Sequence, residues 1–105
     1  HLQTTADAVI DRVALAAIEA VVNCPLVLHG ASGIKAEDRR WLATNTKVCK
    51  FNVGTELRQT FGASLRNVLA SDAHLFDRNQ ILSAVKPALI EQTKKVLKSI
   101  DARKA

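Results

Sequence analysis

Apolar residues recur along this chain at two kinds of spacing. Two short segments, residues 25–29 and 47–53, are largely apolar and are bounded by Pro, Gly or Asn. This pattern is typical of buried strands in a parallel sheet. The segments around them carry apolar residues at steps of three and four, which predicts amphipathic helices. We expect these helices at residues 6–22, 35–46, 55–71 and 77–100.

Boundary residues support these limits. Pro25 ends the first helix, because proline disfavours helical geometry in the residue before it. Thr55 and Asp77 are expected to cap the two C-terminal helices. Pro87 indicates either a kink in the last helix or the first turn of a second one. The expected order of elements is α-β-α-β-α-α.

A small polar loop follows each expected strand. Gly30-Ala31-Ser32-Gly33 follows the first strand, and Asn52-Val53-Gly54-Thr55 follows the second. Glycine lets backbone N–H groups approach a ligand closely, because it has no Cβ. In a (β/α)₈ barrel the loops after the last two strands commonly hold phosphate. The sequence therefore predicts an α/β fold made of the last two βα units of such a TIM barrel plus C-terminal helices.

The length of the chain limits how much of a barrel it contains. A complete barrel needs about 250 residues, whereas this sequence has 105 residues. We therefore expect residues 1–105 to be one C-terminal fragment of a barrel domain. Two strands alone leave sheet edges unpaired, and we expect Leu26, Leu28 and Phe51 to form an exposed apolar surface. The isolated piece is expected to be inactive and stable only by self-association or with the missing residues supplied.

Composition excludes some classes of partner. The formal net charge is +5, with three Phe, one Trp and no Tyr. Because these few aromatics are not interleaved with the basic residues, a solvated helix face is favoured over a nucleic-acid surface. No apolar run approaches the roughly 20 residues of a membrane span. The basic residues of the tail are Lys94, Lys95, Lys98, Arg103 and Lys104.

The two cysteines indicate the redox setting. Cys24 lies just before the first expected strand and Cys49 lies inside the second. Free thiols at such positions are commonly buried, and two thiols do not make a disulfide framework. We therefore expect buried free cysteines and a reducing, cytoplasmic location.

The two loops and the residues around them resemble a known family. The segments Pro25-Leu26-Val27-Leu28-His29-Gly30-Ala31-Ser32-Gly33 and Lys50-Phe51-Asn52-Val53-Gly54-Thr55-Glu56-Leu57-Arg58 are similar to those of class II, metal-dependent ketose-bisphosphate aldolases. Phe76-Asp77-Arg78 and Ile81-Leu82 also agree. The resemblance is to the C-terminal part of the fructose- and tagatose-bisphosphate group and covers residues 10–100.

This resemblance implies a zinc-dependent lyase that cleaves a ketose 1,6-bisphosphate into dihydroxyacetone phosphate and glyceraldehyde 3-phosphate. It implies that His29 is a zinc ligand and that Asn52 lies near the reacting carbon. Arg58, one turn into the following helix, is close enough in sequence to reach a phosphate of this or a neighbouring subunit. The residues implied to bind substrate are Gly30, Ala31, Ser32, Asn52, Val53, Gly54 and Thr55.

These residue types suit the chemistry. Zn²⁺ acts as a Lewis acid on the carbonyl of the sugar, and imidazole is a suitable zinc ligand. Backbone N–H groups at a glycine-rich loop and at the start of a helix suit a phosphate dianion. An asparagine side chain hydrogen-bonds substrate oxygens without adding charge.

Part of the family's site has no counterpart here. The catalytic aspartate and the first histidine ligand are absent, so we assign no catalytic residue. His1 precedes His29 at about the family's spacing between its last two ligands, but it is followed by Leu2 rather than by the family's Gly. Its role as a ligand stays open. His74 lies in a polar turn and is expected to be exposed, and Lys50 belongs either to the site or to the barrel surface.

Other functions stay open as well. A non-catalytic fragment of an aldolase would serve as an assembly or interaction module, because the family commonly forms homo-oligomers, dimers or tetramers, through elements that include its C-terminal helices. A phosphate-binding barrel without metal is a third possibility. The choice between fructose and tagatose bisphosphate also stays open, although Ala31 slightly favours tagatose.

Overall fold

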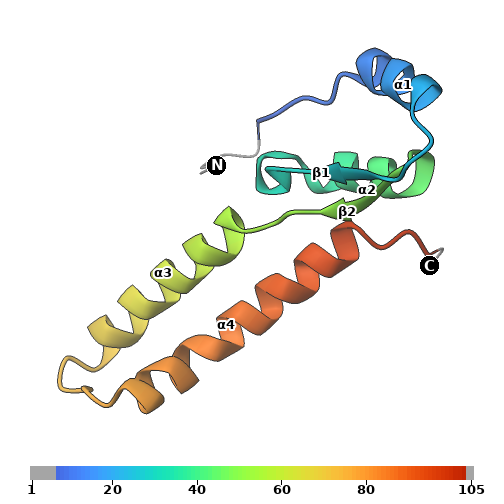
Figure 1. The fold of residues 1–105 in the computed structure, drawn as a ribbon. Coiled ribbons are helices and arrows are strands. Elements are labelled where there is room, and N and C mark those ends of the chain that lie inside the picture. Colours follow the sequence, from blue (N-terminus) through green and yellow to red (C-terminus); the bar gives the residue numbers. More distant parts are fainter. Residues whose placement is uncertain (1–6, 104–105) are drawn as a thin grey trace.

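A computed structural model describes residues 7–103 and gives a mixed α/β arrangement (Figure 1). Two short parallel strands carry helices before, between and after them, in the order that the sequence predicts. One additional turn of 3₁₀ helix, η1, follows the first strand. The elements are α1 (Arg12–Val21), β1 (Leu26–Leu28), η1 (Ala31–Gly33), α2 (Ala36–Asn45), β2 (Val48–Phe51), α3 (Thr55–Ser71) and α4 (Arg78–Ser99).

The unit β1-α2-β2 forms the centre of the structure. The strands run parallel because α2 carries the chain back to the start of the sheet. Glu37 and Asp38 lie in the first turn of α2, where their negative charges interact favourably with the helix dipole. An irregularity of register lies between Leu26 and Val27. The paired residues are Leu26 with Val48, Val27 with Lys50, and Leu28 with Phe51.

The core lies between the sheet and α2. Ile34, Leu42 and Val48 are its buried residues, and Trp41 packs against them. The half-buried residues around this cluster are Ile10, Leu15, Leu26, Leu28 and Phe51. The expectation that Leu26, Leu28 and Phe51 form an exposed apolar surface is therefore wrong.

The exposed face of the sheet carries other side chains. Successive residues of a strand point to opposite faces, and α2 covers the face that Leu26 and Leu28 occupy. Val27, between them, is 46% exposed, and Lys50 opposite it is exposed as well. Alternation along the strand thus decides which apolar residues stay uncovered.

The first helix begins later than its periodicity predicts. The pattern predicts a helix over residues 6–22, of which residue 6 lies outside the described part, but α1 starts at Arg12. Asp11 caps it, since its carboxylate accepts a hydrogen bond from Ala14 N at 2.9 Å. Ahead of the cap, Ala8 pairs with Ile34 in an isolated parallel bridge. A cap and a strand-like contact therefore replace the predicted first turns.

The last two helices form a hairpin that projects from the sheet, which gives the molecule its extents of 58 × 28 × 21 Å (Figure 1). Asp77 caps α4 as predicted, since its carboxylate accepts from Gln80 N at 3.0 Å. The helix continues through Pro87 without a break, which excludes the start of a second helix there. Val85 is buried inside the hairpin.

Both cysteines lie on the surface of the molecule. Cys24 and Cys49 are both free, but both are exposed, so the prediction of buried thiols is wrong. Cys24 lies in the bend before Pro25, outside the strand. Cys49 follows the buried Val48 in β2, where Cys49 and Lys50 are both exposed. Within residues 7–103, no helix combines the length and the apolar character needed to cross a membrane.

Candidate functional site at the carboxyl ends of the two strands

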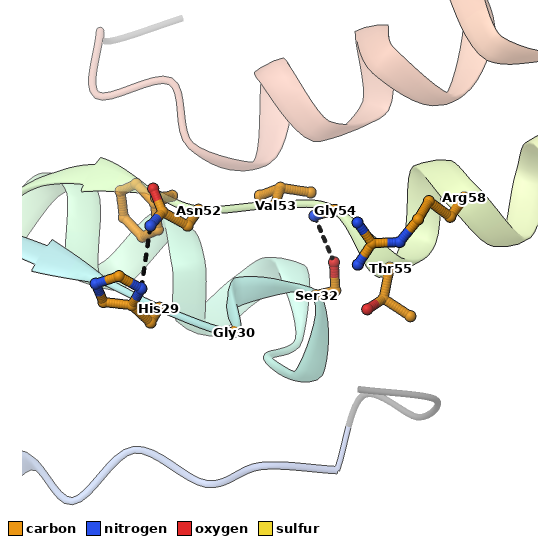
Figure 2. Close-up of a pocket in the computed structure, with 9 residues that line it drawn as sticks. His29, Gly30, Ser32, Asn52, Val53, Gly54, Thr55 and Arg58 are labelled. Carbon is orange, nitrogen blue, oxygen red and sulfur yellow. Dashed lines mark hydrogen bonds between the residues drawn. The ribbon is translucent and has the colours of Figure 1, made fainter. Parts of the chain in front are cut away.

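The two small loops lie side by side at one edge of the sheet, because the carboxyl ends of parallel strands meet there. Between them is a cavity of about 430 Å³. Figure 2 shows this cavity with side chains from both loops and from the start of α3. The residues that line it are His29, Gly30, Ser32, Phe51, Asn52, Val53, Gly54, Thr55 and Arg58.

The loop after β1 turns sharply. Gly30 has a φ of 68°, in the left-handed region, where a Cβ would clash with the backbone. The turn is closed by a hydrogen bond of 3.0 Å from Gly33 N to Gly30 O. Ala31 is fully buried, and its N–H donates to Asn52 O at 3.2 Å. Ala31 is therefore part of the support beneath the cavity, whereas the other six residues implied to bind substrate line it.

Asn52 and His29 lie together because the backbone aligns them. Asn52 N donates to Leu28 O at 2.8 Å, and Asn52 O accepts from Ala31 N, so Asn52 is bonded on both sides of His29. The side-chain nitrogen Nδ2 of Asn52 lies 3.1 Å from His29 Nδ1 (Figure 2). His29 is exposed on its other side.

The contact between Asn52 and His29 determines which ring nitrogen of His29 carries the proton and which one has a free lone pair. With Asn52 Nδ2 donating to Nδ1, the proton of a neutral imidazole sits on Nε2. If the side-chain amide of Asn52 is rotated by about 180°, its Oδ1 accepts from His29 Nδ1–H, and the lone pair of His29 Nε2 faces outward. The second arrangement is the one in which metal-binding histidines are held by their neighbours.

Ser32 connects the two loops. Its Oγ accepts from Gly54 N at 3.4 Å (Figure 2) and from Glu56 N at 3.3 Å. Gly54 occupies the N-cap position of α3 and Thr55 is the first helical residue, so the prediction that Thr55 caps this helix is wrong. The hydroxyl that satisfies the N–H groups of the first turn comes from the other loop.

The cavity is cationic at the α3 end. Arg58 lines it, and no carboxylate is among the lining residues of the described chain. The guanidinium of Arg58 lies over Gly54, where a Cβ would be 3.1 Å from Arg58 Nη1. The side chain of Thr55 is buried beside it. Lys50, whose place the sequence leaves open, is exposed on the sheet and does not line the cavity.

The described residues offer one imidazole at this site. Within residues 7–103, no group of three or more His, Cys, Asp or Glu side chains is arranged to hold a metal ion. His74 is exposed in the turn between α3 and α4, as predicted, and does not line the cavity. His1 lies outside the described residues. The donor chemistry of His29 fits one zinc ligand, and further ligands have to come from elsewhere.

Two charged residues behind the loops are absent from the predicted site. Arg39 of α2 is only 4% exposed, and Glu56 of α3 pairs with it at 2.6 Å. The sequence signal for this burial is weak, since Arg39 stands beside the exposed Arg40. Its one indication is that Arg39 precedes Leu42 by three positions and so shares the buried face of α2.

The geometry brings two small loops, the N-terminus of α3 and one imidazole together at the carboxyl edge of a parallel sheet. A comparison with models of known protein families gives a match over residues 1–104 to the family described as fructose-bisphosphate aldolase class-II. This match covers nearly the whole chain, including both loops and all the helices. The chain therefore belongs to the class II fructose-bisphosphate aldolase family.

Proposed function

We propose that this chain forms the C-terminal part of a TIM-barrel aldolase that cleaves a ketose 1,6-bisphosphate into dihydroxyacetone phosphate and glyceraldehyde 3-phosphate. The chain supplies the phosphate-binding loops and one zinc ligand, His29. The observation that carries this proposal is the cavity at the carboxyl ends of β1 and β2, which brings His29, Ser32, Asn52 and Gly54 together.

Phosphate binding is supported by the loop and helix geometry. The N-terminus of α3 opens on the cavity, and the partial positive charge of a helix N-terminus attracts a dianion. Gly54 N and Glu56 N donate to Ser32 Oγ, which holds the loop after β1 against the first turn of α3. Arg58 adds a positive charge at the same end.

The other end of the cavity is suited to the reacting part of the sugar. His29 and Asn52 lie there, and zinc held by His29 together with ligands from outside the described residues would polarise the carbonyl of the substrate. Asn52 holds the imidazole through Nδ1 and faces the cavity. The sugar is thereby oriented with a phosphate at the α3 end and the carbonyl at the histidine end.

The test is a cleavage assay on the complete zinc-loaded protein, with fructose and tagatose 1,6-bisphosphate compared. We expect turnover of one of them at about 1–10³ s⁻¹, the usual range for enzymes. A chelator should abolish the activity, and added zinc should restore it. His29→Ala should lower kcat by at least about 10–100-fold, because loss of a direct ligand should cost at least as much as loss of a ligand's outer partner. It should lower the bound zinc as well.

His74→Ala is the matched control, because His74 is an exposed histidine outside the cavity. It should leave activity and zinc content unchanged. Turnover that resists the chelator, or full activity of His29→Ala, would contradict the zinc assignment. Retained phosphate binding without zinc would instead favour a metal-free phosphate-binding barrel.

A second candidate is an assembly module, and the surface of the α3–α4 hairpin supports it. Phe61 and Leu69 of α3 and Leu82 and Ile90 of α4 are 37%, 40%, 51% and 43% exposed. A contiguous exposed apolar patch favours self-association, and these four side chains are the candidates for such a patch. We propose that the complete protein is a homo-oligomer that uses this hairpin. Association in sedimentation experiments, with no cleavage of either bisphosphate, would favour the module over the enzyme.

A further inference from the structure

The buried guanidinium of Arg39 contacts the loop after β1 and the side chain of Glu56 in the first turn of α3, behind the cavity. We propose that Arg39 is a positioning residue that fixes the phosphate-binding loop after β1 relative to the first turn of α3, through its pair with Glu56. This inference deepens the proposed function and rests on it for the identity of the ligand. Arg39 itself does not line the cavity, so it acts through the backbone.

Arg39 contacts the loop after β1 through two hydrogen bonds. Arg39 Nε donates to Ala31 O at 2.9 Å and to Ile34 O at 3.1 Å, and both bonds are buried. The carbonyl of Ala31 and the N–H of Ser32 belong to one planar peptide group and point in opposite directions. Fixing that carbonyl therefore fixes the direction of the Ser32 N–H, and Ser32 lines the cavity.

Arg39 also contacts α3, through the side chain of Glu56. Arg39 Nη2 lies 2.6 Å from Glu56 Oε1. That oxygen is buried and has no other hydrogen-bond partner of good geometry among the described residues, so the pairing depends on charge and proximity. The backbone N–H of Glu56 donates to Ser32 Oγ. Glu56 is thus held to the first loop at both its side chain and its backbone.

Helix α4 holds both members of the pair of Arg39 and Glu56. Arg39 Nη1 donates to Ser99 Oγ at 3.2 Å, and Gln92 Nε2 donates to Glu56 Oε2 at 3.2 Å. Ser99 Oγ in turn donates to Val96 O at 2.7 Å. The last turns of α4 therefore hold the outer atoms of the pair in place.

Only arginine has the shape for these contacts. Its guanidinium is planar and carries five N–H donors in a fixed fork, and here Nε, Nη1 and Nη2 each reach a different element. A lysine ammonium is a point charge that cannot span them. Because the group is 4% exposed, water cannot replace a lost contact. A displaced loop would bind phosphate less well, since small misplacements of binding groups are costly.

The experiment compares Arg39→Met, Arg39→Lys and the control Arg40→Met in the complete zinc-loaded protein. Arg40 is the exposed neighbour on the same helix, and its Nη1 donates to Lys98 O at 3.2 Å, away from the loops. The readouts are KM for the bisphosphate, the inhibition constant of inorganic phosphate, kcat, and amide hydrogen exchange of residues 30–34.

For Arg39→Met we expect KM and the phosphate inhibition constant to rise about tenfold, as for the loss of one charge-assisted hydrogen bond. Exchange of residues 30–34 should accelerate, and kcat at saturation should change less than KM. Arg39→Lys should show a smaller rise in the same direction, and Arg40→Met should show none. A residue that only supports folding would lower the active fraction, and with it the apparent kcat, and would leave KM and the exchange of the folded protein unchanged.

If Arg39→Met does not fold, Glu56→Gln provides the second variant, because it keeps the shape and removes the charge. It should raise both constants by about threefold, as for a weakened ion pair. Unchanged constants and unchanged exchange in the folded variants would overturn the inference. A wild-type protein that neither cleaves a bisphosphate nor responds to phosphate would overturn the proposed function instead, and the exchange of residues 30–34 would still decide the role of Arg39.

Discussion

The two loops at the cavity have the same proposed task, yet they are held in different ways. The loop after β1 is closed on itself in a 3₁₀ turn and is fixed from beneath by Arg39. The loop after β2 is extended and is held by hydrogen bonds to its neighbour, from Asn52 and Gly54. One loop therefore depends on a buried charge and on a left-handed glycine, and the other depends on the first loop.

This difference gives a direction of dependence. Asn52 O accepts from Ala31 N and Gly54 N donates to Ser32 Oγ, so two hydrogen bonds join the second loop to the first, and a third joins Glu56 N of α3 to Ser32 Oγ. Besides the bond from Ala31 N to Asn52 O, the first loop is held from α2 by two buried hydrogen bonds of Arg39, which the second loop lacks. Disturbing the first loop should disturb the second, whereas the reverse effect should be weak.

The largest expected effect comes from Arg39→Met. It leaves the buried Glu56 Oε1 without its cation and removes the Arg39 donor from Ile34 O and from Ala31 O, of which Ala31 O keeps its hydrogen bond from Ile34 N. Breaking one side of a buried pair costs about 3–5 kcal/mol in free energy of unfolding. Urea unfolding measures this loss, with Arg40→Met as the control. A loss below about 1 kcal/mol, the usual value for an exposed pair, would mean that the first loop does not depend on this charge.

The next effect separates the glycines of the two loops. Gly30 has a φ of 68°, so Gly30→Ala should lower the free energy of unfolding by about 1–2 kcal/mol through backbone strain. Gly54 has a φ of −145°, which an alanine adopts without that strain. Thermal unfolding of the two variants side by side tests this contrast. Equal losses would show that the loops share one kind of backbone constraint.

Ser32→Ala should have a moderate effect that appears in the second loop. It removes the acceptor of Gly54 N and Glu56 N, and loss of a capping side chain costs about 1 kcal/mol. Amide exchange of residues 54–57 should accelerate. Ser71→Ala is the matched control at the other end of α3, where the hydroxyl donates to Asn67 O. If exchange changes only within residues 30–33, the two loops are independent.

The smallest effect is expected for Gly54→Ala. The added Cβ would lie 3.1 Å from Arg58 Nη1, at the far end of a flexible side chain, so Arg58 has to move aside. Stability should change by no more than about 0.5 kcal/mol. Phosphate inhibition should weaken by about 0.2–1 kcal/mol, the value of one exposed charge contact. An unchanged inhibition constant would remove Arg58 from the phosphate site.

Local signals in the sequence were sufficient for the elements and for the residues around the cavity. Apolar spacing placed both strands and the order of the helices, because these periods follow from backbone geometry. Asp77 capped α4 as predicted, since a cap needs only its own first turn. The strand-loop-helix motifs located the cavity, with six of the seven residues implied to bind substrate lining it.

Only the tertiary structure decided how those residues are held. Ala31 moved beneath the cavity because Asn52 of the other loop takes its N–H. The helix α1 lost its predicted first turns because Ala8 pairs with Ile34, and α3 is capped by Ser32 rather than by Thr55. Only its spacing from Leu42 separates Arg39 from its exposed neighbour in the sequence, yet it is buried and contacts the loop after β1, α3 and α4. Each of these outcomes depends on residues distant in the chain, which local propensity cannot bring together.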